Sequence, residues 1–374
     1  MKRSNHETWM MKALELAEKG RLSVSPNPMV GAVVLRKGKV VGSGYHARFG
    51  AAHAEVTALC RADTAARGAS LYVTLEPCAT WGKTPPCVSA ILRSGIRQVI
   101  IGTLDPNPKN HRKGVQALRQ QGVKVLTGVL AKELEKQNES FFHHVRSGRP
   151  FVTLKMVQSL DGKIATATGE SRWISSDKAR KYVHALRAQQ DAVMVGPKTL
   201  YADNPSLTVR RGSRAVSPEK PWRIVLDPKI KVSPRAKVFK GPQLTLRVVV
   251  HASLLRRNGN GHTKNSAASI FIPVNDKNGR LNMDELLAKL GALGVGRLMV
   301  EGGGELAWSL FEDGLVDRMV WVIAPKVLGG RNATTSVEGT GVARLARAIS
   351  LEDVSCSRLG KDLLYEARPV GRKS

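Results

Sequence analysis

Residues 71–87 read LYVTLEPCATWGKTPPC, and this stretch decides how the first part of the chain folds. The apolar run at 71–75 predicts a buried strand, and the two prolines before Cys87 predict that a helix begins at that cysteine. Cys78 therefore follows a strand, whereas Cys87 lies at a helix start, where the positive end of the helix dipole favours a thiolate. The stretch predicts one strand-to-helix unit of an α/β fold that carries both cysteines.

A histidine and a glutamate precede this stretch in the sequence His53-Ala54-Glu55. They can face one site only near the start of the helix predicted over 53–61, because side chains two positions apart do not face each other along a helix. One imidazole and two thiolates, from His53, Cys78 and Cys87, leave the fourth tetrahedral position of Zn²⁺ to a water molecule whose pKa falls to about 7. Glu55 is then the candidate catalytic residue that carries protons to the leaving amine.

This order of residues is typical of zinc-dependent nucleobase deaminases. The alternative is a pair of structural cysteines and a core histidine, and the complete set in the right order argues against it. In deaminases that act on nucleic acids the two cysteines are usually two residues apart, whereas eight residues separate them here.

The alternation of strands and helices continues on both sides of this unit. The turn sequence Ser147-Gly148-Arg149-Pro150 ends the first series and predicts two α/β domains, 1–147 and 148–374. In the first domain we expect an N-terminal amphipathic helix, a hairpin over 30–35 and 40–45, strands over 71–75, 98–102 and 123–126, and helices over 53–61, 87–94, 115–121 and 130–144. In the second we expect a sheet of mixed direction from strands over 151–157, 192–196, 223–227, 246–251, 297–301, 316–323 and 363–366, with helices over 177–190, capped by Ser176, and 306–312.

The chain is strongly basic, with 59 Lys and Arg against 30 Asp and Glu among 374 residues, a net charge of +29. The excess is spread over both halves, and its densest cluster, at 229–240, predicts a solvated loop because no aromatic residues alternate with the charges. No run approaches the ~18 consecutive apolar residues of a membrane span, and the N-terminus lacks the apolar core of a secretory signal. Four unevenly spaced cysteines do not make a disulfide framework and favour a reducing cytoplasm.

Further motifs surround the candidate zinc residues: SPNPMVGAVV at 25–34, GSGYH at 42–46 and DPNP at 105–108. The second half adds KMVQSLDGKIA at 155–165, GESRWIS at 169–175, GPKTL at 196–200, LTVR at 207–210 and VEGGGEL at 300–306. Together these motifs resemble the bifunctional riboflavin-biosynthesis deaminase/reductase family over roughly residues 5 to 366. The resemblance implies a cytidine-deaminase-like three-layer αβα first domain and a dihydrofolate-reductase-like α/β second domain. It also implies a homo-oligomer.

By this resemblance the first domain converts 2,5-diamino-6-(5-phosphoribosylamino)pyrimidin-4-one to 5-amino-6-(5-phosphoribosylamino)uracil with one Zn²⁺ per chain. The second domain then reduces the ribosyl group to ribityl with NADPH. The resemblance assigns NADPH contacts to Val157, Trp173, Thr199, Asp203, Gly302, Gly303 and Gly304. It assigns substrate contacts to Asn27, His46, Ser171, Arg187, Leu207, Arg210 and Glu301.

Several of these residues also have simpler interpretations. Gly302 to Gly304 can bind a phosphate through backbone amides at a helix start, or they can form a tight strand-to-helix turn. Arg187 and Arg210 offer paired donors to phosphate oxygens, or they form surface salt bridges. The chain departs from the family pattern at Trp81, where a histidine is usual, and at 109–113.

Two other functions fit parts of the sequence. The high charge fits a nucleic-acid-directed zinc deaminase or a basic nucleic-acid-binding protein, although the even spread of the charge argues against nucleic acid as the substrate. In a third interpretation one domain is active and the other is a scaffold. We expect a phosphorylated pyrimidine as the partner, with no nucleic acid and no membrane.

Overall fold

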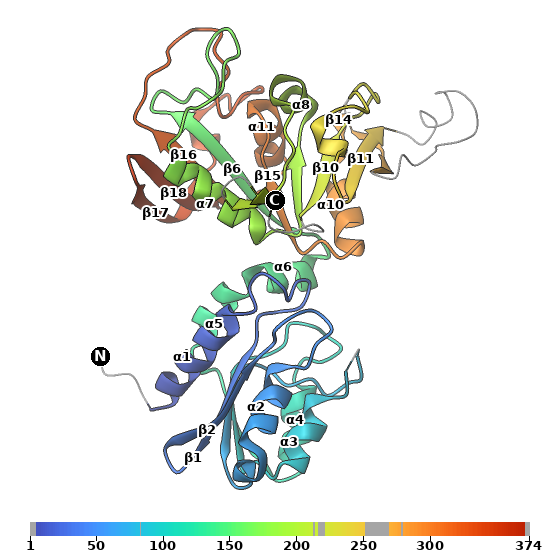
Figure 1. Ribbon diagram of the computed structural model, residues 1–374, viewed down its shortest axis with the longest axis vertical. Helices are drawn as coiled ribbons and strands as arrows, with labels where there is room; N and C mark the ends of the chain where they lie inside the picture. The colour runs from blue at the N-terminus through green and yellow to red at the C-terminus, as the bar shows by residue number, and fades with distance from the viewer. Residues whose placement is uncertain are drawn as a thin grey trace, which may run out of the picture. The chain divides into compact units, whose positions relative to one another are not determined.

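The computed structural model describes residues 5–82, 84–211, 214–215, 221–250, 269–277 and 280–370. The chain divides into two compact units, Met1–Gly148 and Arg149–Ser374, and each is an α/β structure (Figure 1). Within the described ranges, no helix is both long and apolar enough to cross a membrane.

The first unit is built on a five-stranded sheet with the order β2-β1-β3-β4-β5. Its strands are β1 (Gly31–Arg36), β2 (Lys39–Tyr45), β3 (Ser70–Leu75), β4 (Gln98–Thr103) and β5 (Lys124–Thr127). Strand β1 runs antiparallel to β2 and β3, whereas β3, β4 and β5 are parallel. The predicted hairpin and the three predicted strands are confirmed.

Helices cover both faces of this sheet. Helices α1 (Asn5–Glu18) and α5 (Ala131–Gln137) lie on one face, and α2 (Ala54–Ala62), α3 (Cys87–Arg93) and α4 (Lys113–Gln120) lie on the other (Figure 1). Strand β3 supplies both cores, since Leu71 and Val73 pack beneath α2 and α3 while Tyr72 packs beneath α1. The expected three-layer αβα arrangement is therefore confirmed.

The predicted single helix over 130–144 is wrong, because the chain forms two helices, α5 and α6 (Glu139–Ser147), that meet at Asn138. Asn138 leaves the helical conformation, with φ −105° and ψ 22°. Its side chain bonds the backbone of Met29, accepting from the N–H at 2.8 Å and donating to the carbonyl at 2.9 Å. Asparagine competes with regular helix bonding in this way, so a tertiary contact sets the break.

The second unit is built on a nine-stranded sheet with the order β12-β11-β10-β7-β15-β6-β16-β18-β17. The strands are β6 (Phe151–Ser159), β7 (Ala192–Val195), β10 (Trp222–Leu226), β11 (Thr245–Val250), β12 (Ser269–Val274), β15 (Arg297–Val300), β16 (Arg318–Ala324), β17 (Leu351–Leu359) and β18 (Asp362–Pro369). In this spatial order, the strands from β12 through β16 all run parallel to their neighbours. Strand β18 then runs antiparallel to β16, and β17 runs antiparallel to β18. The predicted mixed direction is confirmed.

Helices α7 (Asp177–Ala188) and α8 (Pro197–Asp203) pack on one face of this sheet, and α10 (Met283–Ala292) and α11 (Gly304–Glu312) on the other. The predicted cap of α7 is present, since Ser176 Oγ accepts from the N–H of Ala179. Short elements complete the described chain: η1 (Asp63–Ala66), β8 (Arg210–Arg211), β9 (Arg214–Ala215), η2 (Lys237–Phe239), β13 (Asp276–Lys277), β14 (Arg280–Leu281) and η3 (Leu345–Arg347). The basic side chains of the 229–240 segment are exposed, as the sequence predicts.

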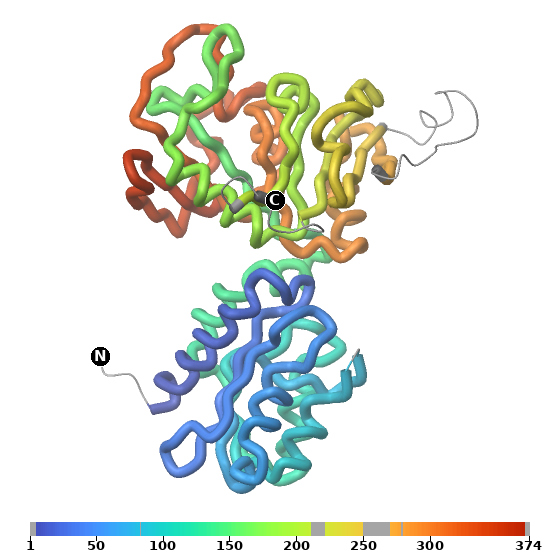
Figure 2. The backbone as a smooth tube through the Cα atoms, in the orientation of Figure 1, coloured from blue at the N-terminus to red at the C-terminus, as the bar shows by residue number. Residues whose placement is uncertain are grey.

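Two long loops of the second unit, after β6 and after β16, run side by side (Figure 2). The N–H of Leu160 donates to Lys326 O at 2.8 Å. Asp161 accepts from Ser159 Oγ at 2.6 Å and from the N–H of Gly329 at 2.7 Å. These bonds lower the pKa of the Asp161 carboxyl to about 2, and the bond from the Ser159 hydroxyl has the largest effect. The charged carboxylate ties both loops together beyond the ends of the central strands.

Candidate active sites in the two units

The first unit brings a histidine and two cysteines together. His53 precedes the first turn of α2, Cys78 follows β3, and Cys87 is the first residue of α3. One ligand atom from each of the three lies within 4.8 Å of the others. His53 Nδ1 is 3.1 Å from Cys87 Sγ and 3.6 Å from Cys78 Sγ. An imidazole nitrogen and two thiol sulfurs are a donor set that zinc takes, so these residues fit a zinc ion.

The surroundings of the three ligands favour thiolate character at Cys78. The Cys87 thiol and the His53 ring donate hydrogen bonds that lower the pKa of Cys78 to about 4. The backbone N–H of Cys87 also donates to Cys78 Sγ, at 3.3 Å. His53 Nε2, on the far side of the ring, lies 3.4 Å from Thr84 Oγ1, which helps to hold the ring orientation.

Glu55 lies in the first turn of α2, two residues after His53. Its side chain is buried, with 3% exposed, and burial raises its pKa despite the nearby His53. A carboxyl group with a raised pKa can both accept and return a proton near neutral pH. The start of α2 thus brings together a candidate metal ligand, His53, and a group suited to proton transfer, Glu55.

A cavity of about 400 Å³ opens onto these residues. Asn27 and His46 line it, and Asn27 Nδ2 donates to His46 Nε2 at 3.1 Å. His46 Nδ1 lies 3.2 Å from Ala52 O, and a carbonyl can only accept, so Nδ1 carries the proton of the ring. Burial lowers the pKa of His46 and keeps the ring neutral. Phe49 and the exposed Trp81 also line the cavity.

A buried glutamate that sequence reasoning missed holds another wall of this cavity. Glu76 follows β3 directly and accepts from the N–H groups of Asp105, Arg112 and Val115 at 3.0 to 3.2 Å. Its signal in the sequence is an acidic residue that directly continues an apolar strand. Glu76 therefore ties the 105–115 segment, whose residues 109–113 depart from the family pattern, to the strand that precedes Cys78.

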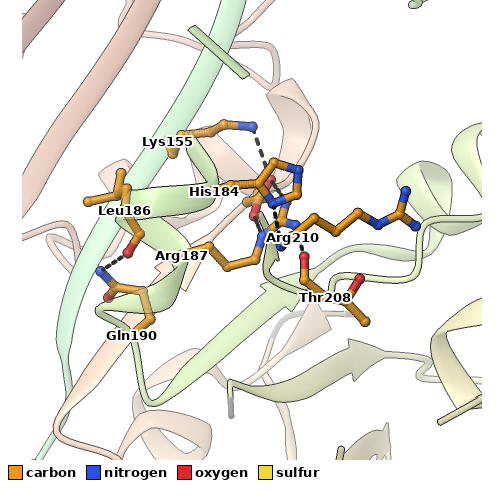
Figure 3. Close-up of polar contacts among 8 residues, drawn as sticks. Lys155, His184, Leu186, Arg187, Gln190, Thr208 and Arg210 are labelled. Carbon is orange, nitrogen blue, oxygen red and sulfur yellow. Dashed lines mark hydrogen bonds and ion pairs between the residues drawn. The ribbon is translucent and has the colours of Figure 1, made fainter. Parts of the chain in front are cut away.

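In the second unit, Glu301 directly follows β15 and joins two basic side chains. Arg187, on α7, donates to both carboxylate oxygens at 2.7 and 3.0 Å, and Lys155, on β6, lies 3.0 Å away. Arg187 Nη1 also donates to Thr208 O at 2.6 Å (Figure 3). Although burial raises the pKa of Glu301, the charges of Arg187 and Lys155 outweigh it, and the pKa is lowered. The carboxylate is therefore charged at neutral pH.

The structure also places the other substrate residues expected in this unit. Ser171 Oγ donates to Asp203 Oδ1 at 2.8 Å, which joins the 169–175 segment to the end of α8. Arg210 is exposed, and in Figure 3 its side chain extends away from Arg187 and Lys155. Leu207, by contrast, directs its side chain into the core beneath α7 and α8.

The residues expected to contact NADPH lie on several elements. Trp173 is 63% exposed, and the Arg180 guanidinium stacks 4.4 Å from its ring centroid. Val157 lies on β6, Thr199 on α8, and the Gly302 to Gly304 run connects β15 to α11. A Cβ added to Gly303 would meet only Thr199 Oγ1, at 4.0 Å, so this backbone is open.

Comparisons with known proteins match both units. The "RibD C-terminal domain" model matches residues 150–365, and the "Cytidine and deoxycytidylate deaminase zinc-binding region" model matches residues 3–103. The chain is 42% identical to the riboflavin biosynthesis protein RibD of Aquifex aeolicus over 365 residues, 97% of this chain and 98% of that protein. It is 37% identical to RibD of Escherichia coli over 366 residues, 96% and 97% of the two chains.

Solved structures of similar proteins match this chain over nearly its whole length. Acinetobacter baumannii RibD superimposes with a TM-score of 0.87 at 31% identity and covers 98% of this chain and 99% of its own. A diaminohydroxyphosphoribosylaminopyrimidine deaminase/5-amino-6-(5-phosphoribosylamino)uracil reductase from Thermotoga maritima superimposes with a TM-score of 0.82 at 34% identity, with the same coverage.

Proposed function

This chain belongs to the RibD family of bifunctional deaminase/reductases of riboflavin biosynthesis, and we propose how its two units divide that work. The unit 1–147 deaminates 2,5-diamino-6-(5-phosphoribosylamino)pyrimidin-4-one. The unit 148–374 then reduces the ribosyl group of 5-amino-6-(5-phosphoribosylamino)uracil to ribityl. The observation that carries the proposal is the cluster of His53, Cys78 and Cys87 beside buried Glu55, in a unit separate from the Glu301 cluster.

In the deaminase unit, His53, Cys78 and Cys87 hold one zinc ion per chain. Zinc in such a site supplies a water molecule whose pKa is near 7. Glu55 moves protons from the attacking water to the leaving amino nitrogen, which its raised pKa permits. Neutral His46 fixes the amide of Asn27, whose carbonyl oxygen can then accept a hydrogen bond from the pyrimidine.

In the reductase unit, NADPH supplies the hydride, and the residues of this chain bind and orient it. The backbone amides of Gly302 to Gly304, at the start of α11, would hold its phosphates, and Val157, Trp173, Thr199 and Asp203 would contact the rest of the cofactor.

The ribosyl substrate binds beside the Glu301 cluster in this proposal. Three N–H groups of Arg187 already bond Glu301 and Thr208, so Arg187 holds these two residues in position. The exposed Arg210 binds the substrate phosphate. Glu301 and Ser171 offer polar groups to the ribosyl chain. Leu207 contributes through its backbone, since its side chain is buried in the core.

The partner in this proposal is a phosphorylated pyrimidine and not a nucleic acid, because the basic residues are spread over both units. We place the enzyme in the cytoplasm as a homo-oligomer, since a reducing compartment keeps both zinc-binding thiols available. All four cysteines of the chain are free, and Cys60 and Cys356 are exposed.

The test supplies the diaminopyrimidinone substrate together with NADPH and follows ammonia release and NADPH oxidation. Cys87→Ser should lose zinc and ammonia release, yet still oxidise NADPH when the deaminated uracil is supplied directly. Cys60→Ser is the matched control, since its thiol is exposed, and should retain about one zinc per chain and both activities. Ammonia release from a zinc-free Cys87→Ser protein, or turnover of a single-stranded oligonucleotide, would contradict the proposal.

A further inference from the structure

We propose that His184 is a positioning residue of the reductase unit, and that it holds the backbone of Arg210 so that the Arg210 guanidinium meets the substrate phosphate. This inference rests on the proposed function, which makes Arg210 the phosphate ligand. His184 does not itself touch the substrate in this proposal.

Two side chains of α7, one helical turn apart, hold the short 208–210 segment at its two ends. The N–H of Arg210 donates to His184 Nδ1 at 3.3 Å, and Arg187 Nη1 donates to Thr208 O at 2.6 Å (Figure 3). Positions three apart on a helix lie on the same face, which lets both side chains reach one segment. The segment thus has a fixed backbone, from which the exposed Arg210 side chain extends.

The bond from Arg210 requires a neutral imidazole. A backbone N–H can only donate, so His184 Nδ1 must accept and cannot carry a proton. Charged groups from four elements face the ring: Lys155 of β6, Arg187 of α7, Arg210 of β8, and Glu301 after β15. Burial and the three cations outweigh the single carboxylate and lower the pKa of His184, which keeps Nδ1 able to accept.

A long, exposed arginine binds phosphate more tightly when its backbone is fixed, because fewer bonds then lose rotational freedom on binding. Without the His184 bond the Arg210 guanidinium is still present, but its position is less well fixed. The expected effect is therefore a higher KM for the ribosyl substrate, with little change in kcat or in the KM for NADPH.

The first experiment compares His184→Ala with His184→Asn in the full-length enzyme, with 5-amino-6-(5-phosphoribosylamino)uracil and NADPH as substrates. Asparagine places an accepting oxygen where Nδ1 lies, so it should restore the bond. We expect His184→Ala to raise the KM for the uracil about three- to tenfold, the range expected of one hydrogen bond, and His184→Asn to stay within about twofold of the wild type. An equal rise in both variants, or a parallel fall in kcat and thermal stability, would overturn the positioning role.

The second experiment adds Arg210→Ala and the double variant. Arg210→Ala should raise the KM at least about tenfold, because a charge-assisted contact is lost, and His184→Ala should then have no further effect in that background. If Arg210→Ala alone leaves the KM unchanged, the phosphate role of Arg210 in the proposed function is wrong. If Arg210→Ala raises the KM but His184→Ala raises it equally in both backgrounds, the proposed function stands and the role of His184 is wrong.

A pH series separates protonation of the imidazole from that of the substrate. The wild-type KM should rise only as the pH falls through the lowered pKa of His184, which lies below the ordinary histidine value of about 6.5, and His184→Asn should not share this rise. The substrate phosphate also titrates, near pH 6, but it affects both proteins alike. A ratio of the two KM values that stays constant from about pH 7.5 down to the lowest pH at which both proteins remain folded would overturn the proposal.

Discussion

Two buried glutamates, Glu55 in the deaminase unit and Glu301 in the reductase unit, have opposite electrostatic environments. The side chain of Glu55 lies among the thiols of the zinc site, and burial raises its pKa. Glu301 is nearly as buried, with 10% of its side chain exposed, yet Arg187 and Lys155 lower its pKa. Burial is common to both, so the neighbouring cations decide whether a carboxyl can exchange a proton or stays charged.

The difference assigns a different kind of work to each glutamate. A carboxyl whose pKa is raised toward neutrality can carry protons, at some cost in stability. A carboxylate held between two largely buried cations cannot, and its loss leaves both cations without their carboxylate partner. Substitution of each by glutamine removes the charge with little change in shape, which tests the comparison directly.

Glu55→Gln should have the largest effect, because it removes the proposed proton carrier. Ammonia release should fall about 10³-fold, within the range for loss of a general acid–base group. Zinc content and NADPH oxidation with the deaminated substrate should stay at the wild-type level, and thermal stability should stay the same or rise, since a buried ionisable group is removed. Stopped-time ammonia assays and metal analysis measure this, and a fall of less than about tenfold would assign the proton transfer to another group.

Glu301→Gln should act chiefly on stability. The second unit should lose about 3 kcal/mol of its free energy of unfolding, since Arg187 and Lys155 would be buried without a carboxylate. Chemical denaturation measures the loss. Glu305→Gln, on the exposed first turn of α11, is the matched control and should change stability by less than about 0.5 kcal/mol.

The pH dependence of the same pair of proteins checks the sign of the shift. The folded-state pKa of Glu301 lies below its unfolded value of about 4.3, so its stabilising effect is complete above that pH and is lost as the pH falls through the folded value. The stability difference between wild type and Glu301→Gln should therefore shrink below about pH 4. A difference that grows on acidification would contradict the assigned environment.

The two units also differ in how much of each could be predicted from the sequence. The proposed zinc ligands were predictable from a local order of residue types, because His53, Cys78 and Cys87 each lie at an element end that the sequence itself marks with an apolar run, a proline or a glycine. The strand and helix pattern around them was predictable for the same reason. The break at Asn138 was not, since a contact to Met29, far away in the chain, sets it.

The reductase unit was less predictable, since its site is made from side chains that lie far apart in the sequence. Because Arg187 is an arginine, the sequence suggested that it binds phosphate. In the structure it bonds Glu301 and Thr208, which come from other elements. Nothing in the sequence indicated the proposed role of His184, because that role depends on a bond to the backbone N–H of Arg210. Strand β17 was missed because nearly all of its side chains are exposed, which removes the alternation that marks a strand.

Gly303→Ala should have the smallest effect of the three substitutions, and it tests whether the glycine run of the reductase unit binds the cofactor. The φ of Gly303 is −85°, which alanine adopts, and an added Cβ would meet only Thr199 Oγ1 at 4.0 Å, so folding should be unchanged. A cofactor phosphate that approaches this backbone would meet the new methyl group, and the KM for NADPH should rise about tenfold.

Gly304→Ala is the informative neighbour, since its Cβ would lie 2.5 Å from Glu338 Cγ and 2.6 Å from Thr335 O. It should lower the thermal stability of the second unit as well as cofactor binding. The adjacent pair therefore separates an effect on binding from an effect on folding. If Gly303→Ala leaves the KM for NADPH unchanged while Gly304→Ala destabilises the protein, the glycines serve only the turn from β15 into α11, and the cofactor phosphates bind elsewhere.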